Sequence, residues 1–193
     1  MNIYTTIKNR RTIRKFTQKK IKYKNIIKMI DYARMAPSAA NIQSLKYMII
    51  YKQEEREKIF PFIKYAGYIP TWNPELNESP TAFIAVLNDT RIRDTNALCE
   101  CDCGIAMMSI CLVASGMRIG SCILGSIDRN KIREILKIDE HYDIMYLIGL
   151  GYSNQNSSLC ETDDDIKYTI DNKRNVIVPK RKLADIIIKN ATE

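Results

Sequence analysis

A run of positive side chains near the start of the sequence could bind an anion. Arg10, Arg11, Arg14 and Lys15 lie within six residues, together with the hydroxyl of Thr12. In an extended chain alternate side chains point to one side, so Arg10, Thr12 and Arg14 would share a face. Guanidinium groups present forked donors that match phosphate oxygens. This segment predicts a phosphate clamp, and the alternative is a solvated surface strand.

A second segment, residues 36–43, could bind a flat ligand. It reads Ala-Pro-Ser-Ala-Ala-Asn-Ile-Gln, with small side chains after a proline. A loop with so little bulk lets a planar ligand approach the backbone, and Asn41 and Gln43 each offer a donor and an acceptor to a heteroaromatic edge. The alternative is an ordinary turn that ends a helix.

Other common site chemistries find little support. His141 is the single histidine, so a site with several histidines is excluded. Cys99, Cys101 and Cys103 follow a C-x-C-x-C pattern, and on a helix alternate thiols point about 200° apart, so we expect no metal site there. With no export signal, the six cysteines are expected to be reduced. A redox role for these three cysteines stays open.

Sequence motifs for phosphate binding in Rossmann and P-loop folds are missing. The sequence contains neither G-x-x-x-x-G-K-[ST] nor G-x-G-x-x-G after a strand. Gly149 and Gly151 lie at the end of an expected strand without a third glycine that opens a helix. We interpret them as a strand exit that requires small residues, which disfavours a Rossmann-bound nicotinamide nucleotide.

The charge distribution leaves a nucleic-acid partner as an alternative to weigh. The chain has 30 basic and 22 acidic residues, and residues 1–30 hold ten of the basic residues and no acidic one. Single-stranded nucleic acid is usually held by aromatic side chains among the charges. The aromatic cluster lies elsewhere, in residues 60–72, so we expect no nucleic-acid partner.

The sequence also indicates where the protein resides. Charges interrupt residues 1–16 throughout, which is unlike a signal peptide. The longest uncharged run, residues 103–117, is shorter than the ~18 to 20 residues of a membrane-spanning helix. We therefore expect a cytoplasmic protein without a membrane partner.

Hydrophobic periodicity and turn residues predict helices and strands without a regular β-α-β alternation, which favours an α+β fold. The expected helices span residues 25–36, 97–115, 128–138 and 183–189, and the expected strands span residues 47–51, 82–87, 121–124, 144–150 and 175–178. Residues 60–80 mix aromatic residues with four prolines and predict an irregular lid or wall.

The long helix at residues 97–115 poses a packing problem. Its second half is apolar on every side, so it must be covered all round. A chain of 193 residues, long enough for one domain, has little material left to wrap it. A second copy would bury the remaining face, which predicts a homodimer.

Taken in order, these segments resemble the nitroreductase family of flavin mononucleotide (FMN) enzymes. Residues 10–16 match its Arg-Arg-Ser-x-Arg-x-Phe motif with Thr12 for serine, and residues 36–43 match Ala-Pro-Ser-x-x-Asn-x-Gln. Residues 102–104 resemble its Asp-x-Gly helix entry, and residues 116–120 its glycine-containing exit. Residues 123–125 resemble the family segment whose backbone faces the reactive flavin nitrogen. Residues 179–182 resemble the family's second phosphate-binding stretch. The chain departs from the family at residues 44–45, where Ser-Leu replaces Pro-Trp, and it is short around residues 52–80.

The resemblance implies a nitroreductase-like fold over residues 1–193 as a single FMN-binding domain. This fold has a central, mostly antiparallel sheet flanked by helices and a long buried helix at a dimer interface, where FMN binds. The phosphate and ribityl end would be bound by Arg10, Thr12, Arg14, Lys180 and Lys182, with Arg11 in the same cluster. The neighbouring subunit would contribute Pro37, Ser38, Ala39 and Asn41, with Gln43 from the same motif, and the backbone at Leu124 and Gly125 would face the reactive flavin nitrogen.

The implied activity is that of an FMN-dependent oxidoreductase. NAD(P)H, a transient co-substrate, would reduce the flavin and leave, and a small electron-poor acceptor such as a nitroaromatic, a quinone or a flavin would then be reduced, which is a ping-pong sequence. No side chain is assigned a catalytic role. The alternative is a non-catalytic FMN-binding or redox-sensing protein of the same fold.

Overall fold

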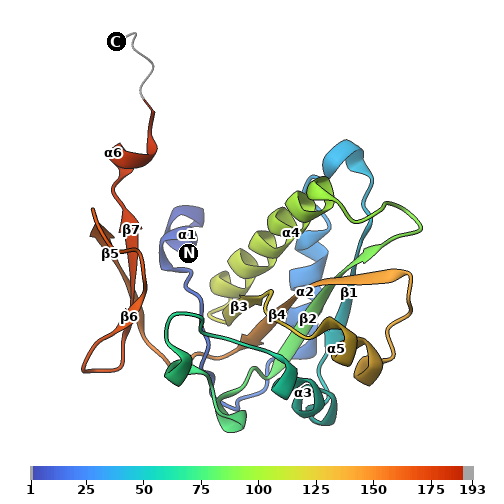
Figure 1. Cartoon of the computed structure of the whole chain (residues 1–193), viewed down its shortest axis with the longest axis horizontal. Helices are drawn as coiled ribbons and strands as arrows, with labels where there is room; N and C mark the ends of the chain where they lie inside the picture. The colour runs from blue at the N-terminus through green and yellow to red at the C-terminus, as the bar shows by residue number, and fades with distance from the viewer. Residues whose placement is uncertain (1, 189–193) are drawn as a thin grey trace.

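A four-stranded sheet forms the centre of the computed structural model, which describes residues 2–188. The strands are β1 (Leu45–Ile50), β2 (Ala82–Asp89), β3 (Gly120–Leu124) and β4 (Tyr142–Gly151). Their order is β1-β2-β4-β3, and every neighbouring pair is antiparallel (Figure 1). This sheet confirms the predicted α+β fold, and each strand lies within two residues of its expected ends.

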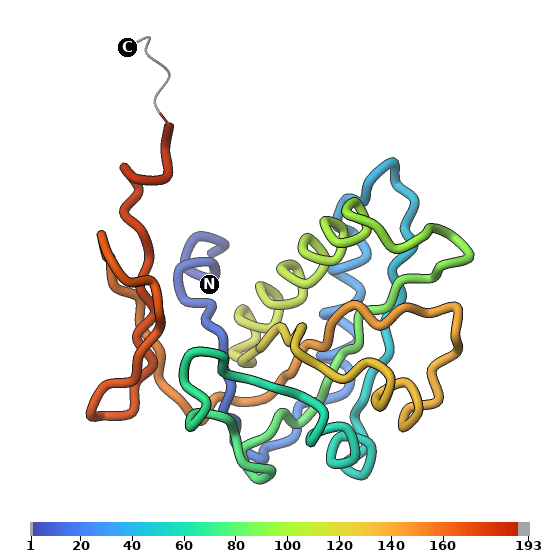
Figure 2. The backbone as a smooth tube through the Cα atoms, viewed as in Figure 1, coloured from blue at the N-terminus to red at the C-terminus, as the bar shows by residue number. Residues whose placement is uncertain are grey.

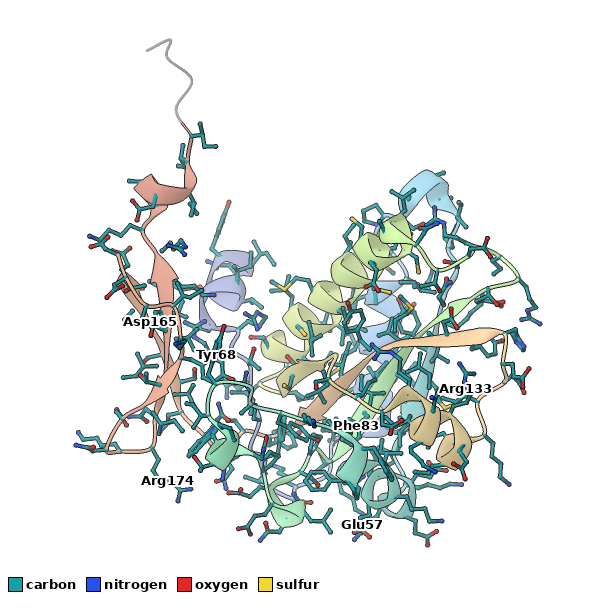
Figure 3. The ribbon with its side chains drawn as sticks, viewed as in Figure 1. Glu57, Tyr68, Phe83, Arg133, Asp165 and Arg174 are labelled. Carbon is teal, nitrogen blue, oxygen red and sulfur yellow. The ribbon has the colours of Figure 1, made fainter. Side chains whose placement is uncertain are left out.

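Helices cover both faces of the sheet. α2 (Tyr23–Ala33) and α4 (Ala97–Gly116) pack on one face, and α3 (Gln53–Ile59) and α5 (Arg129–Leu136) pack on the other. The central strand β2 is buried along its whole length, because alternate side chains enter opposite core clusters. Ala82, Ile84 and Val86 face α2 and α4, and Phe83, labelled in Figure 3, Ala85 and Leu87 face the other side.

Two helices end earlier than expected. α2 stops at Ala33, three residues short of the predicted end, because a residue before proline disfavours the helical conformation and Pro37 thus keeps Ala36 out of the helix. α5 begins after Asp128, whose side chain accepts a hydrogen bond from the Lys131 amide as predicted for a cap. It ends at Leu136 rather than residue 138, because Lys137 adopts a left-handed conformation with φ 53°.

α4 is the long apolar helix that the sequence predicts. The Asn96 side chain caps its first turn, and the helix runs one residue past the expected end. Cys103, Met107, Ile110 and Ala114 are buried against α2 and the sheet. By length and composition it is also the one helix within residues 2–188 that could cross a membrane, a test that core helices pass as well.

Within residues 2–188, nothing covers one face of α4. Leu98, Ile105 and Met108 are 56%, 37% and 39% exposed, and they recur at helical spacing. Together with the buried face they account for the all-round apolar character of the sequence. An exposed apolar stripe of this kind is typical of a surface that another chain covers.

A second, smaller sheet follows the main one. It contains β5 (Ser157–Thr162), β6 (Thr169–Ile170) and β7 (Val176–Arg181) in the order β5-β7-β6, with β5 parallel to β7. Figure 2 shows the orange-red chain of this sheet at the left, apart from the main sheet. This sheet packs on the irregular residues 60–80 through a small cluster of Ala66, Trp72 and Val176.

Several elements were not predicted. The sequence reasoning missed α1 (Ile3–Asn9), α3, β5 and β6. Residues 60–80 are irregular as expected and contain three short 3-10 helices: Phe60–Phe62, Pro70–Trp72 and Leu76–Glu78. The amphipathic helix predicted at residues 183–189 is wrong in extent, because α6 covers only Leu183–Ile186, all exposed, and residue 189 lies outside the described residues.

Substitution of Gly151 by alanine should destabilise the fold. A Cβ at Gly151 would lie 2.6 Å from Cδ1 of Phe16, which is fully buried and whose amide donates to the Glu78 carbonyl. We expect Gly151→Ala to lower the free energy of unfolding by about 1–3 kcal/mol, measured by urea denaturation. Gly67→Ala is the control, because a Cβ there meets nothing within 4 Å. Equal urea midpoints for both variants would contradict this packing.

Candidate functional site

The arginine-rich segment runs in an extended conformation beside β3. Thr12 forms a parallel bridge with Ser121, and the Ile13 amide donates to the Ser121 carbonyl at 2.9 Å. The side-chain oxygen of Gln155 accepts from the amides of Arg14 and Lys15. The segment is thus held on the outer edge of β3, the last strand of the main sheet.

Three of the four positive side chains of this segment lack a matching carboxylate, whereas Lys15 pairs with Glu78 at 2.7 Å. Within residues 2–188 no ion pair involves Arg10, Arg11 or Arg14. The Nε atoms of Arg10 and Arg11 are buried without a hydrogen-bond partner. Burial and the nearby charge of Arg10 lower the pKa of Arg11. Unpaired buried donors carry a desolvation penalty, so this site suits a bound anion.

Arg14 connects the segment to two other parts of the chain. Its Nε donates to the Tyr65 carbonyl at 2.8 Å, and its guanidinium lies 4.7 Å from the ring centre of Tyr168. The Tyr65 hydroxyl is buried without a partner, and burial raises its pKa well above the usual value. Burial likewise raises the pKa of Cys122 to about 12, against the opposing effect of Arg14. Sequence reasoning missed both tyrosines, because nothing in their spacing relates them to Arg14.

Leu124 and Gly125 lie at the end of the same strand. Leu124 is buried and Gly125 is exposed. Leu124 follows Ser121, the bridge partner of Thr12, by three residues, or roughly 10 Å along a strand. The structure therefore brings the arginine segment and residues 124–125 to one edge of the sheet.

The loop at residues 38–43 lies elsewhere, beside the start of α4. Its Ala39 amide donates to Oδ1 of Asp102 at 2.8 Å. A cavity of about 210 Å³ adjoins this loop, and Asn41 is exposed. The cavity is lined in part by Pro37, Ser38, Gln43, Tyr47 and Asp102.

The two groups of predicted residues are therefore separated within one chain. Ala39 contacts Asp102, the sixth residue of α4, whereas the Ile13 amide bonds to the carbonyl of Ser121, on the strand that follows the other end of α4. In Figure 1 the light-blue loop lies near one end of α4, and the dark-blue chain after α1 lies near the other.

The second basic stretch is not joined to the arginines in this structure. Lys180 lies on β7 and Lys182 follows it, and both are exposed. The Nζ of Lys182 forms an ion pair with Asp163 at 2.5 Å. Within the described part of the chain, no hydrogen bond or ion pair links either lysine to residues 10–14.

The three thiols of the C-x-C-x-C pattern do not meet at one point, because Cys99 and Cys103 are neighbours on the buried face of α4 and Cys101 lies on the exposed face. Cys99 and Cys103 are buried, where burial raises the pKa of each thiol, and Cys101 is exposed. All six cysteines are free. Across residues 2–188 no group of three metal-binding side chains comes together.

Comparison with known proteins agrees with this architecture. A protein of Archaeoglobus fulgidus, provisionally named an NADH dehydrogenase/NAD(P)H nitroreductase, is 28% identical over 167 residues, which cover 84% of this chain and 89% of that one. A nitroreductase family protein from Clostridium novyi NT has 23% identity and a TM-score of 0.69, with 97% of this chain and 100% of that chain covered. A provisionally named nitroreductase of Exiguobacterium sibiricum, crystallised with FMN, has 19% identity and a TM-score of 0.68, with 80% and 90% covered. Because the profile of the nitroreductase family matches residues 7–152, this chain belongs to that family.

Proposed function

We propose that the protein is an FMN-dependent oxidoreductase that passes reducing equivalents from NAD(P)H to small electron-poor acceptors by a ping-pong sequence. The acceptors are nitroaromatics, quinones or flavins. The observation that carries this proposal is the unmatched positive charge at Arg10, Arg11 and Arg14, which lies on the same sheet edge as residues 124–125. Family membership and the FMN bound to the Exiguobacterium sibiricum protein support the choice of cofactor.

The residues present fit FMN at both ends. Arg10, Arg11 and Arg14 offer donors and charge for the phosphate, and Thr12 adds a hydroxyl. The arginine segment bridges the outer edge of β3 at Ser121, and we propose that the backbone N–H groups further along this edge, around residues 123–125, meet the ring. When bound, FMN would supply the redox centre. The chain's own residues would neutralise the phosphate and orient the ring, and we assign no catalytic side chain.

The remaining contacts are proposed to come from a second copy. Pro37, Ser38, Ala39, Asn41 and Gln43 lie at the opposite end of α4 from the arginines. They would face the flavin held by the partner chain. The exposed stripe on α4 is the surface that such a partner would cover.

Lys180 and Lys182 are proposed to reach the phosphate, which requires Lys182 to exchange its ion pair with Asp163. Residues 1–193 are proposed to act as one FMN-binding domain. The protein is proposed to work in the cytoplasm, with neither nucleic acid nor membrane as a partner.

The purified protein should be yellow and should release FMN on acid precipitation, because no covalent attachment is proposed. It should oxidise NADH or NADPH in the presence of a quinone or a nitroarene, followed by absorbance. Folded protein that is colourless, and whose melting temperature free FMN leaves unchanged, would contradict the cofactor assignment. Bound FMN without turnover would instead support the non-catalytic alternative.

Arg14→Ala should weaken FMN more than riboflavin, because only FMN carries the phosphate. A charge-assisted hydrogen bond is worth about 1.5–3 kcal/mol. The dissociation constants of both ligands are measured by quenching of flavin fluorescence. Lys24→Ala, an exposed residue of the same basic run, is the control. Equal losses for the two ligands would remove Arg14 from the phosphate site.

Met108→Glu should abolish dimer formation and FMN binding together, because it places a charge in the exposed apolar stripe of α4. Leu76→Glu, at a residue with 47% exposure outside α4, should leave both intact. Light scattering measures the mass, and the single chain is 22.3 kDa. A stable, FMN-loaded monomer of the wild type at micromolar concentration would contradict the shared site.

A further inference from the structure

The buried side chains of Arg93 and Asp102 form hydrogen bonds with the backbone of the loop at residues 38–43. Oδ1 of Asp102 accepts a hydrogen bond from the Ala39 amide at 2.8 Å. Oδ2 of Asp102 accepts from Nη1 of Arg93 at 2.9 Å, and Nη2 of Arg93 donates to the Ala39 carbonyl at 3.3 Å. The ion pair therefore binds both polar backbone groups of one residue. The two side chains are only 8% and 4% exposed.

The loop that they hold is strained. Ala40, Asn41 and Gln43 have φ values of 51°, 54° and 55°, in the left-handed region that non-glycine residues avoid. Such a conformation persists only where the surroundings determine it. The other hydrogen bonds of residues 39–43 lie within the loop, and Ser38 accepts two of them. Among the described residues, Arg93 and Asp102 are its hydrogen-bonding anchors to the rest of the chain.

A hydrogen bond from Asn88 holds the backbone of Arg93 in place. The side-chain amide of Asn88, at the end of β2, donates to the Arg93 carbonyl and to the Thr95 hydroxyl, each at 2.9 Å. The Arg93–Asp102 pair thus connects the loop to the central strand β2 and to α4. A buried ion pair gains little stability over apolar packing, and its better-attested use is to specify one conformation.

We propose that Arg93 and Asp102 are positioning residues that hold residues 38–43 in the conformation that meets the flavin. This inference rests on the proposed function, and it assigns a role to two residues that touch no cofactor themselves. Because the loop serves the partner's site in the proposed dimer, the pair in one chain would control flavin affinity in the other.

The test compares Arg93→Met, Arg93→Lys and Asp102→Asn with Arg91→Met. The control removes a neighbouring arginine whose ion pair with Asp89 does not touch the loop. If loss of the hydrogen bonds to Ala39 leaves the loop in its binding conformation for about a tenth of the time, the affinity for flavin falls about tenfold. FMN and riboflavin should weaken by the same factor, unlike in Arg14→Ala, because the loop does not meet the phosphate. Arg93→Lys, which keeps the charge, should recover part of the loss.

Hydrogen exchange of the flavin-free chains supplies a second readout. Peptides that cover residues 38–43 should exchange faster in Arg93→Lys and Asp102→Asn than in the wild type and Arg91→Met, with β2 unchanged. This measurement and the milder variants decide the matter if Arg93→Met fails to fold. Unchanged affinity and exchange would overturn the positioning role alone. A folded wild-type chain that binds no flavin would overturn the proposed function, and this inference with it.

Discussion

The length of α4 sets the geometry on which the candidate site depends. The helix closes one side of the core, yet its outer stripe of Leu98, Ile105 and Met108 stays exposed in a single chain. It also separates Asp102, which holds the small-residue loop, from the surroundings of Arg10. Because a rigid helix keeps the two groups apart, we propose that a flavin meeting both lies between two chains. In this proposal one second copy of the chain both covers the exposed stripe of α4 and completes the divided site.

Much of the fold follows from patterns that are local in the sequence. The continuous apolar run of β2 predicts a strand buried on both faces, and the apolar run of α4 predicts a core helix. Charged α3 and the exposed strands β5 and β6 carry no such pattern, because their stability comes from contacts with distant segments. The predicted extent of the last helix was wrong for the opposite reason: its apolar residues repeat, but nothing within residues 2–188 covers them.

The same distinction applies to the site. The spacing of Arg10, Thr12 and Arg14 predicts an extended, charged face, and the structure has this segment extended beside β3. The contacts of Arg14 with Tyr65 and Tyr168 could not be predicted, because they join residues far apart in sequence. The hydrogen bonds of Arg93 and Asp102 to Ala39 also join residues far apart in sequence. Asp102 belongs to a sequence motif, but no pattern in the sequence connects it with Arg93.

Mixed dimers test most directly whether two chains build each flavin site. Arg14→Ala and Asn41→Ala chains, co-expressed with different tags, would each bind FMN weakly as homodimers. In the mixed dimer both lesions fall on one site, so half of the sites should bind FMN with wild-type affinity. The reverse control pairs a wild-type chain with the double variant and should have no wild-type site. Restored sites in the control, and none in the mixed dimer, would place the whole site within one chain.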